Sequence, residues 1–185
     1  LTGLEFAYGI PGNIGGCIYM NASAFNNDIS SIVYKTIAFD ASSGKILNLN
    51  KEEHKYGTKS SLFMENKNLF ILKTYFKLNV GKREDILFNM NNNLQKRLEC
   101  QPLDFPSAGS VFKRPKVGYA SKYIDELGLK GFKIGGAMVS KKHAGFIVNI
   151  GNASSNDVKE LVTIIKNKVM KEYNVSLEEE IIYIE

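Results

Sequence analysis

The stretch SIVYKTIAFDASSGKILNL, residues 31–49, decides the fold class of this chain. Residues 31–40 are rich in β-branched and aromatic side chains, residues 41–45 are small or polar, and residues 46–49 are again mostly apolar. This order is typical of two strands joined by a tight turn. A further β-rich run covers residues 69–78. Because strands joined by short turns pair antiparallel and helices are interspersed irregularly, the sequence favours an α+β fold over a parallel doubly wound sheet.

Three helices are predicted from apolar spacing. Residues 83–99 carry leucine and methionine on one stripe, and residues 119–127 end before a glycine that suits a left-handed position. The clearest helix covers residues 157–173, which have one continuous apolar face. Ser155 or Asn156 is expected to cap its start.

A connector divides the chain into two predicted domains. Residues 101–107, QPLDFPS, contain two prolines, which cannot continue a helix because they lack a backbone N–H. We therefore predict one domain over residues 1–100 and another over residues 101–185. The second is expected to end in a strand, 177–184, that contains three successive glutamates.

Composition excludes several classes of protein. The hydrophobic content of 44% and charged content of 23% are ordinary for a soluble domain, and no apolar run is long enough to span a membrane. The two cysteines form no metal-ligand cluster and suit a reduced cytoplasm. The net charge of +5 raises nucleic-acid binding as an alternative, but the lysines are scattered, with one dense cluster at 141–143. A lysine-rich surface, which also favours an anionic small ligand, is the better interpretation.

The glycine-rich opening is the first candidate site. Closely spaced glycines at 9–12 and 15–16 can present backbone N–H groups to a phosphate or a flavin. Pro11 is expected in the first turn of a short helix. The spacing is neither the dinucleotide-binding nor the P-loop pattern, so a tight turn that packs a helix on a sheet is an equally open interpretation.

Two further candidates lie near the end of the chain. In PSAGSVFKRP, residues 106–115, Ser110 precedes two cations, Lys113 and Arg114, and a serine placed there can donate a proton beside an anion. A turn whose hydroxyls bond local backbone is the alternative. Glu180 lies in the acidic terminal segment, where a solvated edge strand is the alternative.

Taken in order, these segments resemble the UDP-N-acetylenolpyruvoylglucosamine reductase family. The motifs that carry the resemblance are GLEFAYGIPGNIGG (3–16) with YMNA (19–22), PSAGSVFKRP (106–115), GLKGFKIGGA (128–137), VSKKHAGFIVN (139–149) and LEEEI (177–181). The resemblance covers essentially all 185 residues.

The resemblance implies a flavoenzyme of peptidoglycan synthesis. Such an enzyme uses FAD and NADPH to reduce UDP-N-acetylglucosamine enolpyruvate to UDP-N-acetylmuramate in the cytoplasm, and we expect a monomer that binds neither nucleic acid nor membrane. Residues 1–100 would be the remainder of an FAD-binding domain and residues 101–185 a substrate-binding domain. The chain would be the C-terminal portion of such an enzyme without the N-terminal part of the FAD-binding domain, so we expect weak FAD binding.

The resemblance also implies roles for individual residues. Ser110 takes the place of the family's proton donor and Glu180 that of its catalytic glutamate. Lys59 stands where the pattern Tyr-Arg-x-Ser-x-Phe has arginine. The implied cofactor-binding residues are Ile10, Gly12, Gly15, Gly16, Asn21, Ala22 and Arg97. The implied substrate-binding residues are Lys113, Arg114 and His143, and no metal site is implied.

Departures from the family pattern leave other functions open. Lysine at position 59 offers one mobile point charge where arginine offers a planar fork, Thr58 replaces a tyrosine, and Ile182 replaces an arginine, so we expect a slower enzyme. One alternative is a non-catalytic UDP-sugar-binding fragment or homologue. Others are a flavin oxidase that shares only the architecture and, more remotely, a nucleic-acid-binding protein.

Overall fold

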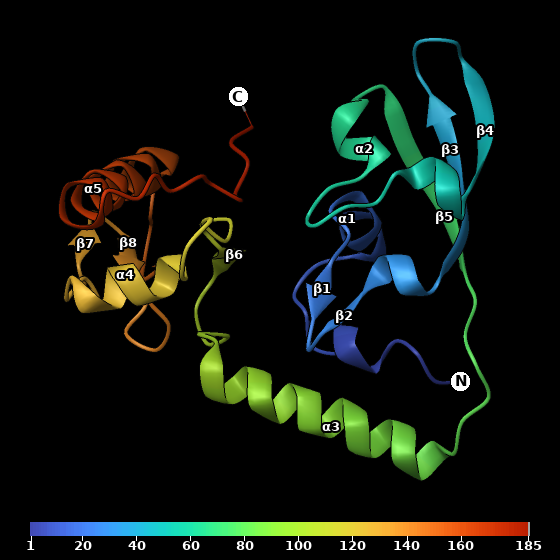
Figure 1. Ribbon diagram of the computed structural model, residues 1–185, viewed down its shortest axis with the longest axis horizontal. Helices are drawn as coiled ribbons and strands as arrows, with labels where there is room; N and C mark the ends of the chain where they lie inside the picture. The colour runs from blue at the N-terminus through green and yellow to red at the C-terminus, as the bar shows by residue number, and fades with distance from the viewer. Residues whose placement is uncertain (185) are drawn as a thin grey trace. The chain divides into compact units, whose positions relative to one another are not determined.

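A computed structural model describes residues 1–184. The chain folds as two compact units, which we call unit 1 (Leu1–Arg97) and unit 2 (Leu98–Glu185) (Figure 1). The strand pairs within the described residues are all antiparallel, so the predicted α+β class is confirmed.

Unit 1 is built on a sheet in the order β4-β3-β5. Strands β3 (Val33–Asp40) and β4 (Lys45–Asn50) form the predicted hairpin, and β5 (Leu69–Phe76) pairs with the other edge of β3. Helices α1 (Ile14–Tyr19) and α2 (Leu62–Glu65) pack against β5. The shorter elements are η1 (Glu5–Ala7), β1 (Ser23–Ala24), β2 (Asn27–Asp28), η2 (Ile29–Ser31) and η3 (Lys51–His54).

The core of unit 1 lies on one face of this sheet. Its buried residues are Phe6, Ile18, Ile29, Val33, Ala38, Leu49 and Phe63. On the sheet's other side Phe39 stands in register with both Ile46 and Phe70, which are 56% and 55% exposed. Apolar side chains therefore remain in contact with solvent on that side of unit 1.

The glycine-rich opening does not begin a helix at Pro11 as predicted. Helix α1 starts at Ile14, and the side chain of Asn13 caps it by accepting the Gly16 N–H at 2.9 Å. Asparagine is among the best N-cap residues, and its position two residues later fixes the start. Pro11 therefore lies in the turn before the helix.

The predicted helix of residues 83–99 is confirmed as α3 (Arg83–Cys100). Its apolar stripe is only partly covered, since Leu87 and Leu98 are exposed. Contacts with the opening segment hold it to unit 1: Asn93 Nδ2 donates to the Glu5 carbonyl at 3.0 Å. A side chain at Gly9 would lie 2.8 Å from the Leu94 side chain, so glycine is needed for this close approach.

Unit 2 has a sheet in the order β6-β9-β8-β7, packed against α5 (Figure 1). The strands are β6 (Ser107–Ser110), β7 (Lys133–Ile134), β8 (Ala137–Val139) and β9 (Phe146–Asn149), and the helices are α4 (Ala120–Glu126) and α5 (Ser155–Tyr173). The apolar face of α5 supplies much of the core through Leu161, Val162, Ile165 and Val169. The two predicted helices of this unit are therefore confirmed.

The cap of α5 differs from the prediction. Ser154, one residue before the expected positions, accepts the Asp157 N–H at 3.1 Å, and Asp157 Oδ2 accepts the Ser154 N–H at 2.9 Å. Asp157 Oδ2 also accepts the N–H of Gly136, at the turn between β7 and β8, at 3.2 Å. A side chain at Gly135 would lie 2.5 Å from this carboxylate, which explains why glycine stands there. One carboxylate thus joins the start of α5 to the sheet.

The predicted terminal strand over residues 177–184 is wrong beyond its first residues. Only Glu179 forms a β-bridge, with Phe112, among the described residues of this segment. In that register Ile182 would face Gly109, whose φ of +84° is not extended. The ladder therefore cannot continue along β6.

The cap assignment can be tested by substitution. Ser154→Ala should lower the free energy of unfolding of unit 2 by about 1 kcal/mol, because the Asp157 N–H loses its acceptor. Urea unfolding followed by circular dichroism measures this loss. Ser155→Ala, one residue further on, is the control and should change stability by less than about 0.5 kcal/mol. A larger loss at Ser155 than at Ser154 would contradict the assignment.

Candidate functional site

In unit 2 the segment that carries Glu180 pairs with the segment that follows Ser110, although the two residues are 70 positions apart in the sequence. The Glu180 N–H donates to the carbonyl of Val111 at 2.8 Å, and the Lys113 N–H donates to the carbonyl of Glu178 at 2.9 Å. The side chain of Ser110 is exposed at the end of β6, and no residue in 1–184 forms a hydrogen bond with its hydroxyl. A hydroxyl and a carboxylate are thus carried by neighbouring backbone segments.

The other two acids of the terminal segment form ion pairs. Glu178 contacts Lys113 Nζ at 3.2 Å, and Glu179 contacts Lys166 Nζ of α5 at 2.9 Å. Burial, together with the nearby Glu179, raises the pKa of Tyr183 to about 12. Glu178 and Glu179 are thus each held by a lysine, Lys113 after β6 and Lys166 of α5.

Lys59 belongs to unit 1, where it stands in a tight turn. Gly57 and Ser60 exchange backbone hydrogen bonds of 3.1 and 3.4 Å, so Thr58 and Lys59 form the tip of the turn. Lys59 has φ +53°, in the left-handed region that non-glycine residues seldom adopt.

A hollow of about 730 Å³ in unit 1 contains Lys59 in its lining, together with Tyr56 and Asp28. Burial, and then the charge of Asp28, raises the pKa of the Tyr56 hydroxyl. The hollow therefore combines an ammonium group with a phenol that stays protonated.

The residues predicted to bind the cofactor divide into two groups. Gly12 and Gly16 are exposed, Ile10 and Gly15 are half-buried, and a side chain at Gly12 would meet nothing within 4 Å. By contrast, Asn21 and Ala22 are only 5% and 6% exposed, and both are hydrogen-bonded inside the unit. An open backbone surface thus exists before and along α1.

Arg97 is buried at the end of the part of α3 that belongs to unit 1. It donates to the Phe6 carbonyl at 3.2 Å, and its guanidinium lies 5.3 Å from the ring centroid of Phe25. Burial lowers its pKa. Its predicted cofactor contact remains a prediction.

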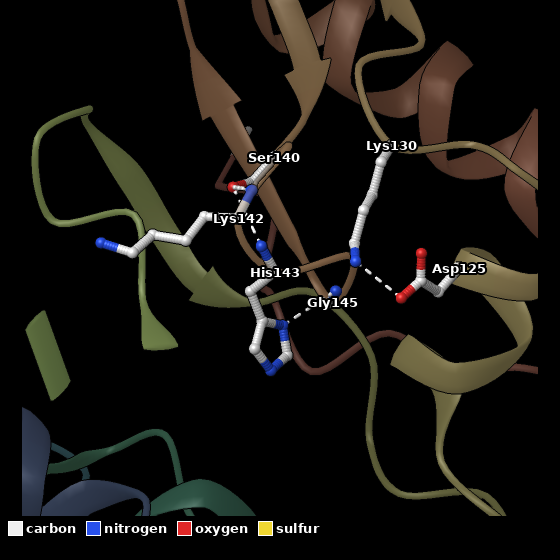
Figure 2. A network of polar contacts seen from close by, with 6 residues as sticks. All are labelled: Asp125, Lys130, Ser140, Lys142, His143 and Gly145. Atoms are coloured by element: carbon white, nitrogen blue, oxygen red, sulfur yellow. Dashed lines mark hydrogen bonds and ion pairs between the residues drawn. The ribbon is translucent and has the colours of Figure 1, made fainter. Parts of the chain in front are cut away.

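His143 lies in a hollow of about 610 Å³ in unit 2, lined also by Lys130, Lys142 and Asp125. Figure 2 shows the imidazole extending from the turn that follows β8, with Nδ1 directed at Gly145. Nδ1 accepts the Gly145 N–H at 3.1 Å, so the proton of the neutral ring is on Nε2. The hollow therefore offers an N–H donor from His143.

Local packing explains the motif around His143. The hydroxyl of buried Ser140 accepts the N–H groups of Lys142 and His143 at 3.1 and 3.3 Å. A side chain at Gly145 would lie 3.0 Å from His143 Cε1 and 3.3 Å from Ser121 Cβ, so only glycine fits without moving the ring. Burial lowers the pKa of His143, and the Lys130 ammonium acts in the same direction.

Several residues of this surface were not singled out from the sequence. Lys130 pairs with Asp125 at 2.6 Å (Figure 2). Lys142 Nζ donates to the carbonyl of Leu98. The predicted Arg114 stacks on Tyr119, with its guanidinium 4.3 Å from the ring centroid. Lys130 lies inside the motif of residues 128–137. Considering the cations of neighbouring motifs as one group would have identified it from the sequence.

Other kinds of site are not found in the described part of the chain. Within residues 1–184 no three side chains of histidine, cysteine, aspartate or glutamate gather as a metal site would require. In the same range, no helix has both the length and the apolar content needed to span a bilayer.

Unit 2 is thus an antiparallel α+β domain with a hollow lined by lysines, two acids and an imidazole, and with Ser110 and Glu180 near one short backbone pairing. Residues 101–184 match the family described as UDP-N-acetylenolpyruvoylglucosamine reductase, C-terminal domain. The chain as a whole is a homologue of the UDP-N-acetylenolpyruvoylglucosamine reductases and corresponds to the C-terminal part of their sequence.

Individual relatives agree with this assignment. The reductase of Thermosipho melanesiensis is 47% identical over 181 residues, and that of Clostridium tetani is 44% identical over 184 residues. The crystal structure of the Thermus caldophilus reductase superposes with a TM-score of 0.83 at 34% identity and covers 97% of the chain. The chain spans 61%, 59% and 63% of these three proteins.

The protonation state of His143 can be measured directly. An NMR titration should place its pKa below its ordinary value of about 6.5, because burial disfavours the charged ring. Lys130→Met should raise this pKa, since it removes a nearby cation, whereas Lys168→Met on the exposed side of α5 should not. A value at or above 6.5 in the unsubstituted chain would contradict the described environment.

Proposed function

We propose that this chain carries the catalytic serine and glutamate and the sugar-nucleotide site of a reductase that converts UDP-N-acetylglucosamine enolpyruvate to UDP-N-acetylmuramate. The observation that supports this most is the backbone hydrogen bond from Glu180 to Val111, the residue after Ser110. The homology to reductases over 97% of the chain supports it independently. The product is a precursor of peptidoglycan.

The hollow around His143 suits the diphosphate of the sugar nucleotide. The Nε2–H of His143 and the ammonium groups of Lys130 and Lys142 provide donors and positive charge, while the carboxylates of Asp125 and Glu126 neutralise part of that charge. Arg114, on the segment after β6, adds an exposed cation, and its neighbour Lys113 is paired with Glu178. Such a site binds an anion by charge-assisted hydrogen bonds.

FAD fits the open backbone near Gly12 and Gly16 better than the buried residues Asn21 and Ala22. Gly12, Gly15 and Gly16 leave room for a planar group or a phosphate, and the backbone there can be approached closely. When bound, FAD would carry the hydride that NADPH supplies to the substrate. The roles of Ile10, Gly12, Gly15 and Gly16 are proposed on this basis.

In the reduction, a hydride adds to the methylene carbon of the enolpyruvyl group and negative charge develops at the carboxylate end as an enolate. The Lys59 ammonium would offset this charge, and the Ser110 hydroxyl would give its proton to the adjacent carbon. Glu180, whose N–H bonds to the residue after Ser110, would orient the Ser110 hydroxyl. Overall, NADPH and one proton together reduce one enolpyruvyl double bond.

The proton-donor role is tested by Ser110→Ala. Product formation, measured on the chain with excess FAD and NADPH, should fall about 10²- to 10⁴-fold, because no group would protonate the enolate. The affinity for the UDP-sugar, measured by calorimetry, should not change. Ser107→Ala, at the exposed start of β6, is the control. Unchanged turnover in Ser110→Ala would contradict the role.

Product formation and affinity for the UDP-sugar also separate the proposed reductase from a non-catalytic alternative. A chain that binds the UDP-sugar but forms no product with excess FAD would be a non-catalytic binding module. Oxygen consumption with an alcohol substrate would instead indicate a flavin oxidase.

The effect of lysine at position 59 is tested by Lys59→Arg. The rate of product formation should rise, by up to about 10²-fold, because arginine holds a carboxylate with two fixed donors. Lys55→Arg is a matched control, since Lys55 also has a left-handed backbone, with φ +49°. An unchanged rate in Lys59→Arg would show that the substitution is harmless or that another residue occupies the cation position.

A further inference from the structure

A buried amide links the Lys59 turn to a distant part of unit 1. Asn21 is 5% exposed, and its Nδ2 donates to the carbonyl of Gly57 at 2.9 Å. Its Oδ1 accepts the N–H of Ser30 at 3.0 Å. The amide therefore bridges the first residue of the turn and the η2 segment, and both bonds lie in a partly buried environment where water competes weakly.

The turn that Asn21 holds is a strained one. Lys59 has φ +53°, where the side chain crowds the backbone, and neither glycine nor asparagine stands there to relieve the crowding. Such a conformation persists only where the surroundings fix it, and it is found often at functional sites. Asn21 itself has φ +48°, which asparagine tolerates better than most residues.

The residues just before Asn21 hold the side of the turn that follows Ser60. The hydroxyl of Ser61, which is fully buried, donates to the carbonyl of Tyr19. Before the turn, the ring of Tyr56 stacks on buried His54 with centroids 5.1 Å apart. The tip that carries Lys59 is therefore fixed on both sides, and Asn21 bonds directly to Gly57, the residue before the tip.

We propose that Asn21 is a positioning residue that holds the Gly57–Ser60 turn so that Lys59 stays in the lining of the hollow. Asn21 and Lys59 line the same hollow, together with Asp28 and Tyr56. Asn21 acts through Lys59 and needs no contact with substrate. This role rests on the proposed function of Lys59.

Hydrogen exchange tests the mechanical part of the proposal without any activity. Asn21→Asp keeps the acceptor for the Ser30 N–H but removes the donor to Gly57, and Asn21→Gly removes both bonds while permitting the left-handed backbone. In both variants the amides of Gly57 and Ser60 should exchange about tenfold faster than in the unsubstituted chain. Asn152→Asp, at a left-handed asparagine of unit 2 with φ +54°, is the control. Unchanged exchange in both variants would overturn the proposal.

A kinetic cycle tests the functional part. Asn21→Gly should lower kcat about tenfold in the chain with Lys59 and leave kcat unchanged in the Lys59→Met background, because the lost positioning then has nothing to act on. An equal loss in both backgrounds would overturn positioning through Lys59. If Lys59→Met itself leaves turnover unchanged, the proposed function of Lys59 is wrong, and the exchange result alone decides whether Asn21 holds the turn.

Discussion

The pairing of the chain's last residues with the segment after β6 is the contact on which the candidate chemistry depends. Two backbone hydrogen bonds, between Glu180 and Val111 and between Lys113 and Glu178, set the register of the terminal segment. In this register the side chains of Glu178 and Glu179 form ion pairs with Lys113 and Lys166. A short pairing of this kind brings the backbone of Glu180 to the residue after Ser110 without requiring a full strand.

The two units hold their side chains in place in different ways. In unit 2, Gly145 leaves room for the imidazole of His143, and Gly135 leaves room for the Asp157 carboxylate at the start of α5. In unit 1, the Lys59 turn is held in an unfavourable conformation by the buried Asn21. Both arrangements restrict the motion of side chains for which a role is proposed.

The sequence predicted the elements whose signals are local. The hairpin of residues 31–49 and the apolar face of α5 follow from composition and spacing, and both are confirmed. The cap of α5 was misplaced because residues 154–156 are all good caps, and only the bond from Gly136 to Asp157 selects Ser154. The predicted terminal strand is too long, because the alternation of side chains in the sequence does not show that Gly109 has a left-handed backbone.

The least predictable features are those that join distant residues. The bond from Asn21 to Gly57 spans 36 positions, and no local pattern distinguishes that asparagine from one that contacts a ligand. The resemblance to a family supplied Ser110 and Glu180 as a pair, whereas the residues alone left a turn and a solvated edge as open interpretations. Their proximity required the folded register of unit 2.

The uncovered side of the unit 1 sheet affects how the protein behaves in solution. Ile46 and Phe70 flank Phe39 across the three strands, and within residues 1–184 the outer edges of β4 and β5 have no further strand paired to them. Exposed apolar side chains next to open backbone edges favour association of one chain with another. Aggregation during concentration should therefore begin at this sheet, and a lysine at position 46 or 70 would improve solubility without disturbing either core.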